Sequence, residues 1–255
     1  LKEESKKEEL AQLNLIAGKK AKIATAYETA IKYLGTSLML LNINSWKNNY
    51  DLTLETHIEA AEVEYLNGNF EVSKELGNIV LYYASNLLDK VKIYEIQIQS
   101  CMAQNYLQEA LEIGITVLNI LGVRLPIEPK FHHFLKYFAE TNLVLFGKTI
   151  EDLAYLSRMT DTYKLAAMQI LMLIAPAASM VNSLQFPLAI FAMVRLSVKY
   201  GNSSFAAYGY SIYGAIICEK LGDIERGYRF GQLGILLLDK LNATSLKCKV
   251  YFVFN

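Results

Sequence analysis

The chain has 255 residues, which is enough for one large or two ordinary globular units with a buried core. Its 25 Lys and Arg residues balance its 25 Asp and Glu residues, so charge gives no reason to expect nucleic acid or an anionic membrane as a partner. Hydrophobic residues make up 53% of the chain, so we expect many elements to be buried on more than one side. Cys101, Cys218 and Cys248 lack any C-x-x-C spacing, which indicates reduced thiols and a cytoplasmic protein.

Apolar residues recur at helical spacing almost throughout the chain, and turn residues separate the periodic stretches. The first predicted helix ends at Gly18, as its C-cap. Further helices are expected at 21–41, 50–66, 69–86, 88–104 and 105–121. After the prolines of GVRLPIEP at 122–129, helices are expected at 130–147 and 149–156, then from Asp161 as an N-cap, and at 204–221, 223–241 and 244–255. No strand pattern is found.

Residues 165–194 contain no charged side chain, which raises the question of a membrane span. A spanning helix needs about 20 unbroken apolar residues. Here Gln169, Pro176 and the polar run NSLQFP at 182–187 divide the stretch. We therefore expect two buried helices and no membrane partner, with a transmembrane hairpin as the alternative.

A helix pair is repeated. GNFEVSKELGNIVL at 68–81 returns as NYLQEALEIGITVL at 105–118, and GDIERGYRFGQLGI from Gly222 is a looser copy. The first two turns are 37 residues apart (105 − 68), close to the roughly 34 of tetratricopeptide repeats (TPRs). The pattern predicts an all-α fold, a TPR-like right-handed α-solenoid of antiparallel helix pairs. Small residues should lie where paired helices touch, with Ser73 against Ala61 and Gly227 against Ala215.

We expect one continuous helical array in three parts. Residues 1–123 form N-terminal TPR-like pairs, residues 124–160 a proline-containing connector with irregular helices, and residues 161–255 C-terminal TPR-like pairs. The chain starts without an initiator Met and ends in the apolar run KVYFVFN. Both ends suggest a fragment of a longer polypeptide.

Such an array has a concave face, and helical spacing predicts which side chains line it. The candidate groove residues are Glu55, Ile58, Glu62, Tyr65, Lys92, Glu95, Gln99 and Met102. A groove of this kind suits a peptide, a protein partner or another part of the same polypeptide. The alternative is that these side chains only face solvent or the next repeat.

Motifs for chemistry are absent from the sequence. Gly18, Lys19 and Lys20 have no upstream glycine for a phosphate loop, and Lys19, Lys20 and Lys22 are interpreted as a solvated corner between helices. His57, His132 and His133 have no metal-ligand spacing. We therefore predict no catalytic, cofactor-binding or metal-binding residue and no cofactor. The tyrosines of the helical stripes, such as Tyr82, Tyr210 and Tyr213, are interpreted as packing residues with the hydroxyl at the rim of the core.

Several stretches together resemble one region of a known family. They are LNLIAGKKAKIATAYETAIKYL at 13–34, SWKNNYDLTLETHIEAAEVEYLNGNFE at 45–71, LLDKVKIYEIQIQSCMAQNYLQEALEIGITVLNILGVRLP at 87–126 and IEDLAYLSRMTDTYKLAAMQILMLIAPAAS at 150–179. The family is the very large bacterial signalling proteins, common in cyanobacteria, that join a serine/threonine kinase domain and an AAA-type ATPase to a TPR-like helical region, a GAF domain and a histidine kinase domain. The chain is similar to the helical region after the ATPase.

The resemblance implies a place in signal transduction and no activity for this piece, because the ATP-binding and kinase motifs of the family lie in flanking domains. The expected function is a non-catalytic regulatory and scaffolding region that binds a peptide, a partner or a neighbouring domain and couples it to ATPase or kinase output. The alternative is an all-helical enzyme or carrier with a lipophilic pocket lined by residues 165–217.

Overall fold

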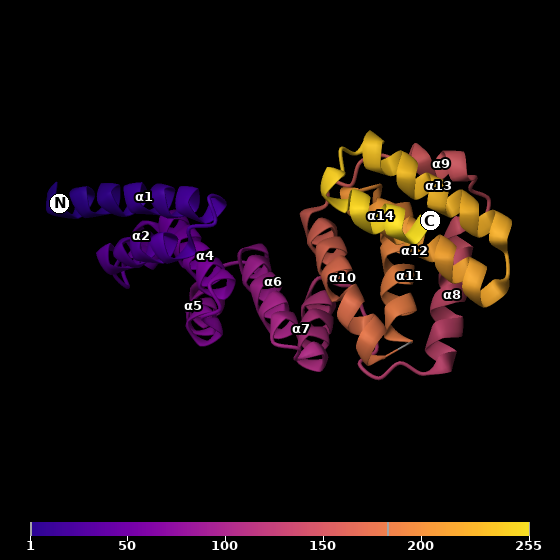
Figure 1. The fold of residues 1–255 in the computed structure, drawn as a ribbon, viewed down its shortest axis with the longest axis horizontal. Coiled ribbons are helices and arrows are strands. Elements are labelled where there is room, and N and C mark those ends of the chain that lie inside the picture. Colours follow the sequence, from indigo (N-terminus) through magenta and orange to yellow (C-terminus); the bar gives the residue numbers. More distant parts are fainter. Residues whose placement is uncertain (1, 183, 255) are drawn as a thin grey trace. The chain divides into compact units, whose positions relative to one another are not determined.

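The computed structural model describes residues 2–182 and 184–254, and this part of the chain is all-helical (Figure 1). A single residue pair, Arg158 and Asn202, forms an isolated bridge. The chain divides into two compact units, Leu1–Gln104 and Asn105–Asn255. The proline-containing segment 122–129 therefore lies inside the second unit.

The first unit holds six helices among its described residues: α1 (Lys2–Ile23), α2 (Tyr27–Leu40), α3 (Ser45–Asn48), α4 (Tyr50–Leu66), α5 (Phe70–Tyr83) and α6 (Leu87–Ala103). Helix α1 packs along α2, α4 packs on both α2 and α5, and α6 contacts α4 and α5. One buried cluster joins Leu15 and Leu34 to Val63, and a second joins Trp46 to Val80 and Ile93. Apolar residues of α4 enter both clusters, so this helix is the centre of the unit.

The end of the first helix differs from the prediction. Helix α1 continues through Gly18 to Ile23, and the turn to α2 is made at Thr25, whose φ is 57°. A Cβ on Gly18 would meet Leu34 Cγ at 2.6 Å, so the glycine allows α2 to pack closely against α1. Gly18 is a packing glycine, and its assignment as a C-cap was wrong.

The predicted contact in the repeat is confirmed. Ser73 Oγ in α5 donates a hydrogen bond to the Ala61 carbonyl oxygen in α4 at 2.7 Å, and both residues are buried. A Cβ on Gly77, one turn further along α5, would lie 3.0 Å from Ile93 Cγ2 in α6. Small residues thus set two successive helix contacts in this unit.

The second unit contains α7 (Leu107–Ile120), α8 (Phe131–Leu145), α9 (Ile150–Ala154), α10 (Thr162–Val181), α11 (Gln185–Tyr200), α12 (Ser204–Leu221), α13 (Ile224–Lys240), the 3-10 helix η1 (Thr244–Leu246) and α14 (Lys247–Phe254). Asp161 caps α10 as expected, since its Oδ1 accepts from the backbone N–H groups of Tyr163 and Lys164. Helix α10 packs on α7 and α11, while α11 also packs on α8 and α12. Helix α10 is long and apolar enough to cross a membrane, and 50% of its apolar window is buried in the protein.

Helices α12 and α13 pack on each other (Figure 1), and glycines allow their close approach. A Cβ on Gly227 would lie 2.6 Å from the Gly214 carbonyl oxygen, and one on Gly214 would lie 2.5 Å from the Gly227 carbonyl oxygen. The predicted partner, Ala215, is exposed instead. The error is one residue, which rotates a side chain by about 100° around a helix of 3.6 residues per turn.

Two tyrosines of this unit also differ from the prediction. The side chains of Tyr210 and Tyr213 are fully buried, and their hydroxyls have no hydrogen-bond partner among the described residues. Tyr213 packs edge-on against Phe230, with 4.9 Å between ring centroids. Burial raises the pKa of the Tyr213 phenol to about 12. The hydroxyls therefore lie inside the core rather than at its rim, whereas Tyr82 is 78% exposed.

Candidate functional site

Seven charged residues of the first unit form a separate ion pair and a linked group of five, which together we call the charged face: Lys19 and Glu55, and Lys22, Glu59, Glu62, Lys92 and Glu95. Lys19 of α1 pairs with Glu55 of α4. Lys22 Nζ lies 2.5 Å from Glu59 Oε2 and 2.7 Å from Glu62 Oε2. Lys92 Nζ of α6 lies 3.0 Å from Glu62 Oε1 and 3.9 Å from Glu95 Oε2. Glu62 therefore connects lysines of two different helices.

The spacing of the sequence produces this arrangement. Glu55, Glu59 and Glu62 follow each other at four and three residues, so they share one face of α4. Lys19 and Lys22 stand three residues apart in the last two turns of α1 and face those glutamates. The interpretation of these lysines as a solvated corner was wrong, because α1 extends past Gly18. Matching the spacing of the lysines to that of the glutamates could have identified the contact.

The network shifts the pKa values of its members in opposite directions. Burial alone would lower the pKa of the Lys22 ammonium, but Glu59 and Glu62 outweigh burial and raise it. Burial would raise the pKa of the Glu62 carboxyl, but Lys22 and Lys92 outweigh burial and lower it. Glu95 is different, because burial raises the pKa of its carboxyl to about 7 against the weaker opposing effect of Lys92. Ion pairing thus holds Glu62 ionised, whereas Glu95 titrates near neutral pH.

The eight candidate groove residues fall into two groups. Glu55, Glu62, Lys92 and Glu95 belong to the charged face, which brings four of them together. The other four, Ile58, Tyr65, Gln99 and Met102, are half-buried. Ile58 and Tyr65 pack against the cluster around Trp46 and serve the core. Sequence reasoning missed Lys19, Lys22 and Glu59.

The Glu95 carboxyl makes the stability of the protein depend on pH. In the unfolded chain a glutamate titrates near pH 4.3, so between about pH 4.3 and pH 7 the folded state binds more protons than the unfolded state. Protonated Glu95 contributes its full stabilisation below the pKa that this carboxyl has in the unfolded chain. The stabilisation is lost as the pH rises through the pKa that it has in the folded chain. We expect Glu95→Gln, which cannot ionise, to be about 2 kcal/mol more stable than the wild type at pH 8 and equal to it near pH 4.

Urea unfolding at several pH values checks this expectation. Glu75→Gln is the matched control, because Glu75 is exposed on α5 in the same unit. A difference between Glu95→Gln and the wild type that stays constant from pH 4 to pH 8 would show that Glu95 does not titrate in this range.

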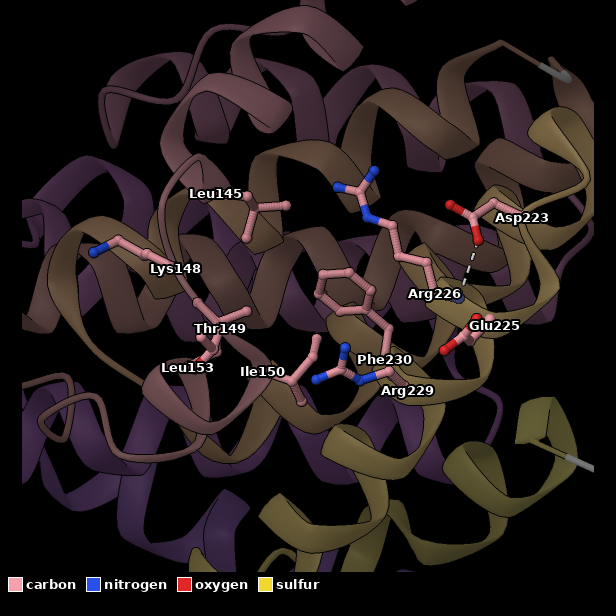
Figure 2. A pocket seen from close by; sticks show the side chains of 10 residues that line it. All are labelled: Leu145, Lys148, Thr149, Ile150, Leu153, Asp223, Glu225, Arg226, Arg229 and Phe230. Carbon is pink, nitrogen blue, oxygen red and sulfur yellow. Dashed lines mark hydrogen bonds between the residues drawn. The ribbon is translucent and has the colours of Figure 1, made fainter.

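A hollow in the second unit has a mixed lining (Figure 2). It has a volume of about 440 Å³ and lies between the end of α8, α9 and the start of α13. Figure 2 shows the side chains of Arg226 and Arg229 on either side of the Phe230 ring. Arg226 Nη2 donates to Asn142 Oδ1 at 2.9 Å, and Arg229 pairs with Glu151 at 3.5 Å. Because carboxylates also line or border this hollow, it does not select a ligand by the sign of its charge.

Another hollow of about 510 Å³ is mostly apolar. Pro176, Phe186, Tyr208 and Ile212 line it together with residues of α14 that include Phe252. Lys249 is its one charged lining residue among those described. Part of its lining comes from the range 165–217, where a lipophilic pocket is the alternative expectation.

No group of three His, Cys, Asp or Glu side chains in residues 2–182 and 184–254 could hold a metal ion. Among the cysteines, Cys101 is buried and Cys248 is exposed. The charged face can form ion pairs, and its Glu95 carboxyl can exchange a proton near neutral pH.

Comparison with known proteins gives one distant similarity. The chain is 20% identical over 271 aligned positions to the hybrid signal transduction histidine kinase G of Dictyostelium discoideum. The alignment covers 94% of this chain and 8% of the kinase, so the chain spans a small part of that protein. No family model matches the chain, and no solved structure matches it. The similarity supports a relation to signalling proteins.

Proposed function

We propose that this chain is a non-catalytic regulatory and scaffolding region of a cytoplasmic multidomain signalling kinase. It binds a peptide, a partner or a neighbouring domain and couples this binding to ATPase or kinase output. The observation that carries the proposal is the similarity to a hybrid histidine kinase, which runs through almost the whole chain but covers only 8% of the kinase. A segment that makes up so small a part of a kinase can regulate the activity of the other domains without catalysing a reaction itself.

The proposed architecture is a TPR-like right-handed α-solenoid of antiparallel helix pairs. Two pairs support it: α4 with α5, which touch through Ala61 and Ser73, and α12 with α13, which touch through Gly214 and Gly227. Both pairs follow from copies of the repeated sequence at Gly68 and Gly222. Stacked pairs of this type present extended surfaces to partners.

The charged face is the proposed contact surface of the first unit. The side chains of Lys19, Glu55 and Lys92 are 41%, 46% and 42% exposed, so a partner can reach both signs of charge. Glu62 and Lys22 lie deeper, and Glu62 pairs with the exposed Lys92. Alternating charges of this kind contribute more to specificity than to affinity. The partner proposed here carries a complementary alternation of acidic and basic side chains.

Isothermal titration calorimetry between this chain and the remaining domains of its natural polypeptide tests the proposal. We expect saturable binding, weakened at least tenfold by Glu55→Ala with Lys92→Ala. The matched control is Glu71→Ala with Lys74→Ala, which removes the same two charges from the exposed surface of α5. Binding that is absent, or equal in both double variants, would contradict the proposed surface, and ATP hydrolysis by this chain alone would contradict the non-catalytic role.

The alternative function, an all-helical carrier or enzyme with a lipophilic pocket, is favoured by the apolar hollow beside α14. Its volume of about 510 Å³ lies within the range of about 300 to 1,000 Å³ found for small-molecule sites. Titration with a fluorescent fatty acid distinguishes the two functions. Saturable binding of the fatty acid at one site would favour the carrier function. No binding of the fatty acid would favour the regulatory function.

A further inference from the structure

A pocket of the second unit differs from the others in its charge. It has a volume of about 460 Å³ and lies between the connection from α7 to α8, the start of α10 and the second half of α11. Its four charged lining residues, Arg124, Lys164, Arg195 and Lys199, are all basic. No carboxylate lines it among the described residues. A concave site lined by one sign of charge raises the local concentration of the opposite ion.

The connection that carries Arg124 is held in place by two hydrogen bonds. Tyr137 Oη donates to the Arg124 carbonyl oxygen at 2.6 Å. Lys164 Nζ donates to the Leu121 carbonyl oxygen at 3.0 Å, next to Gly122, whose φ is +78°. A neutral carbonyl does not cancel the charge of Lys164. These hydrogen bonds fix the wall of the pocket that carries Arg124, which reduces the entropy that binding must overcome.

The cations are neutralised to different extents. Arg195 pairs with Glu140 and lies over the Tyr137 ring at 4.5 Å, so its charge is largely balanced. The ammonium groups of Lys164 and Lys199 lie 5.6 Å and 5.2 Å from the centre of the Tyr200 ring. The Arg124 side chain is exposed and has no hydrogen bond or ion pair with the described residues. Three cationic groups therefore remain available to an anion.

The other walls of the pocket are apolar. Val123, Val144, Leu196 and Val198 line it, and the ring of Tyr200 stands among the cations. Its volume of about 460 Å³ lies within the range of small-molecule sites, which is about 300 to 1,000 Å³. Inorganic phosphate would satisfy the cations but would leave the apolar walls uncovered. A guanidinium with free donors can bind phosphate oxygens in a bidentate manner.

We infer that this pocket binds a small organic phosphate, with Arg124, Lys164 and Lys199 around the phosphate and the apolar walls against the organic part. The site lies apart in sequence from the charged face and extends the proposed function: it gives the helical region a soluble ligand in addition to a protein partner. A ligand that bridges the connection, α10 and α11 stabilises their packing.

Calorimetry of the intact chain with adenosine monophosphate, inorganic phosphate and adenosine as probes tests this inference. We expect adenosine monophosphate to bind at least tenfold more tightly than inorganic phosphate, and adenosine to bind least. Raising the salt concentration from 50 to 500 mM should weaken the binding of the nucleotide, because the attraction is electrostatic. Failure of both phosphates to bind at millimolar concentration would overturn the inference.

Two variants locate the site. Arg124→Ala and Lys199→Ala should each weaken binding of adenosine monophosphate at least fivefold with an unchanged melting temperature. Lys130→Ala is the matched control, since it removes an exposed positive charge at the end of the same connection without lining the pocket. Equal affinity in all three variants would contradict the site. A polyglutamate peptide that binds more tightly than the nucleotide would show an acidic protein surface as the ligand instead and would also overturn the inference.

Discussion

Gly227→Ala is expected to lower the free energy of unfolding of the second unit by about 3 kcal/mol, the upper part of the range for overpacking. The added Cβ would lie 2.6 Å from the Gly214 carbonyl oxygen and would also collide with Cys218 Sγ. A backbone carbonyl cannot rotate away, so α12 and α13 would have to separate. Tyr213 and Phe230, which meet between these helices, would then lose their contact. Urea unfolding followed by circular dichroism measures the loss.

Gly35→Ala is the control for this substitution. Gly35 lies inside α2 with nothing within 4 Å of an added Cβ. Alanine there should stabilise the first unit by about 0.5 to 1 kcal/mol through helix propensity. If Gly227→Ala were no less stable than Gly35→Ala, the close contact between α12 and α13 would be incorrect.

Lys22→Met is expected to destabilise the first unit by about 2 kcal/mol, because it leaves two half-buried carboxylates without their shared partner. The Lys22, Glu59 and Glu62 side chains are only 18%, 14% and 19% exposed, so water replaces the lost ammonium poorly. Methionine keeps the apolar stem of the side chain, and the loss therefore reports on charge. Thermal unfolding at pH 7 measures it.

The pH dependence of the same variant gives a second criterion. Lys22 and Lys92 lower the pKa of Glu62 against the effect of burial, so the stabilisation by this carboxylate is present above its unfolded pKa and is lost as pH falls through the folded pKa. The cost of Lys22→Met should therefore shrink toward pH 3. Lys20→Met, at an exposed position of the same helix turn, is the control. Equal melting temperatures of the two variants at pH 7 would exclude an energetic role for the network.

Much of the helical order could be predicted, because turn residues separate strongly periodic stretches. The helix at 50–66 matches α4, and the helix at 204–221 matches α12. The end of α1 could not be predicted in this way. Gly18 has the chemistry of a C-cap, but it allows Leu34 to pack closely, while Thr25 takes the positive φ that is unusual for a β-branched residue. The packing of α1 against α2 therefore determines that the turn is made at Thr25 and not at Gly18.

The site was predicted in part for a related reason. Helical spacing predicts that Glu55, Glu62, Lys92 and Glu95 face the same groove. The structure brings these four into the charged face, but it buries Glu95. The contribution of Lys22 depends on which helix lies opposite the end of α1, and periodicity carries no information about that. The basic pocket was missed because Arg124 and Lys199 are 75 residues apart (199 − 124) and belong to no motif.

The rate of autophosphorylation of the natural polypeptide that carries this chain tests the regulatory role most directly. Glu55→Ala with Lys92→Ala should change this rate at least threefold, while Glu71→Ala with Lys74→Ala on α5 should leave it unchanged. Both double variants should unfold at the same temperature as the wild type. A rate that is the same in the wild type and in both double variants, with the fold intact, would contradict a regulatory role for the charged face.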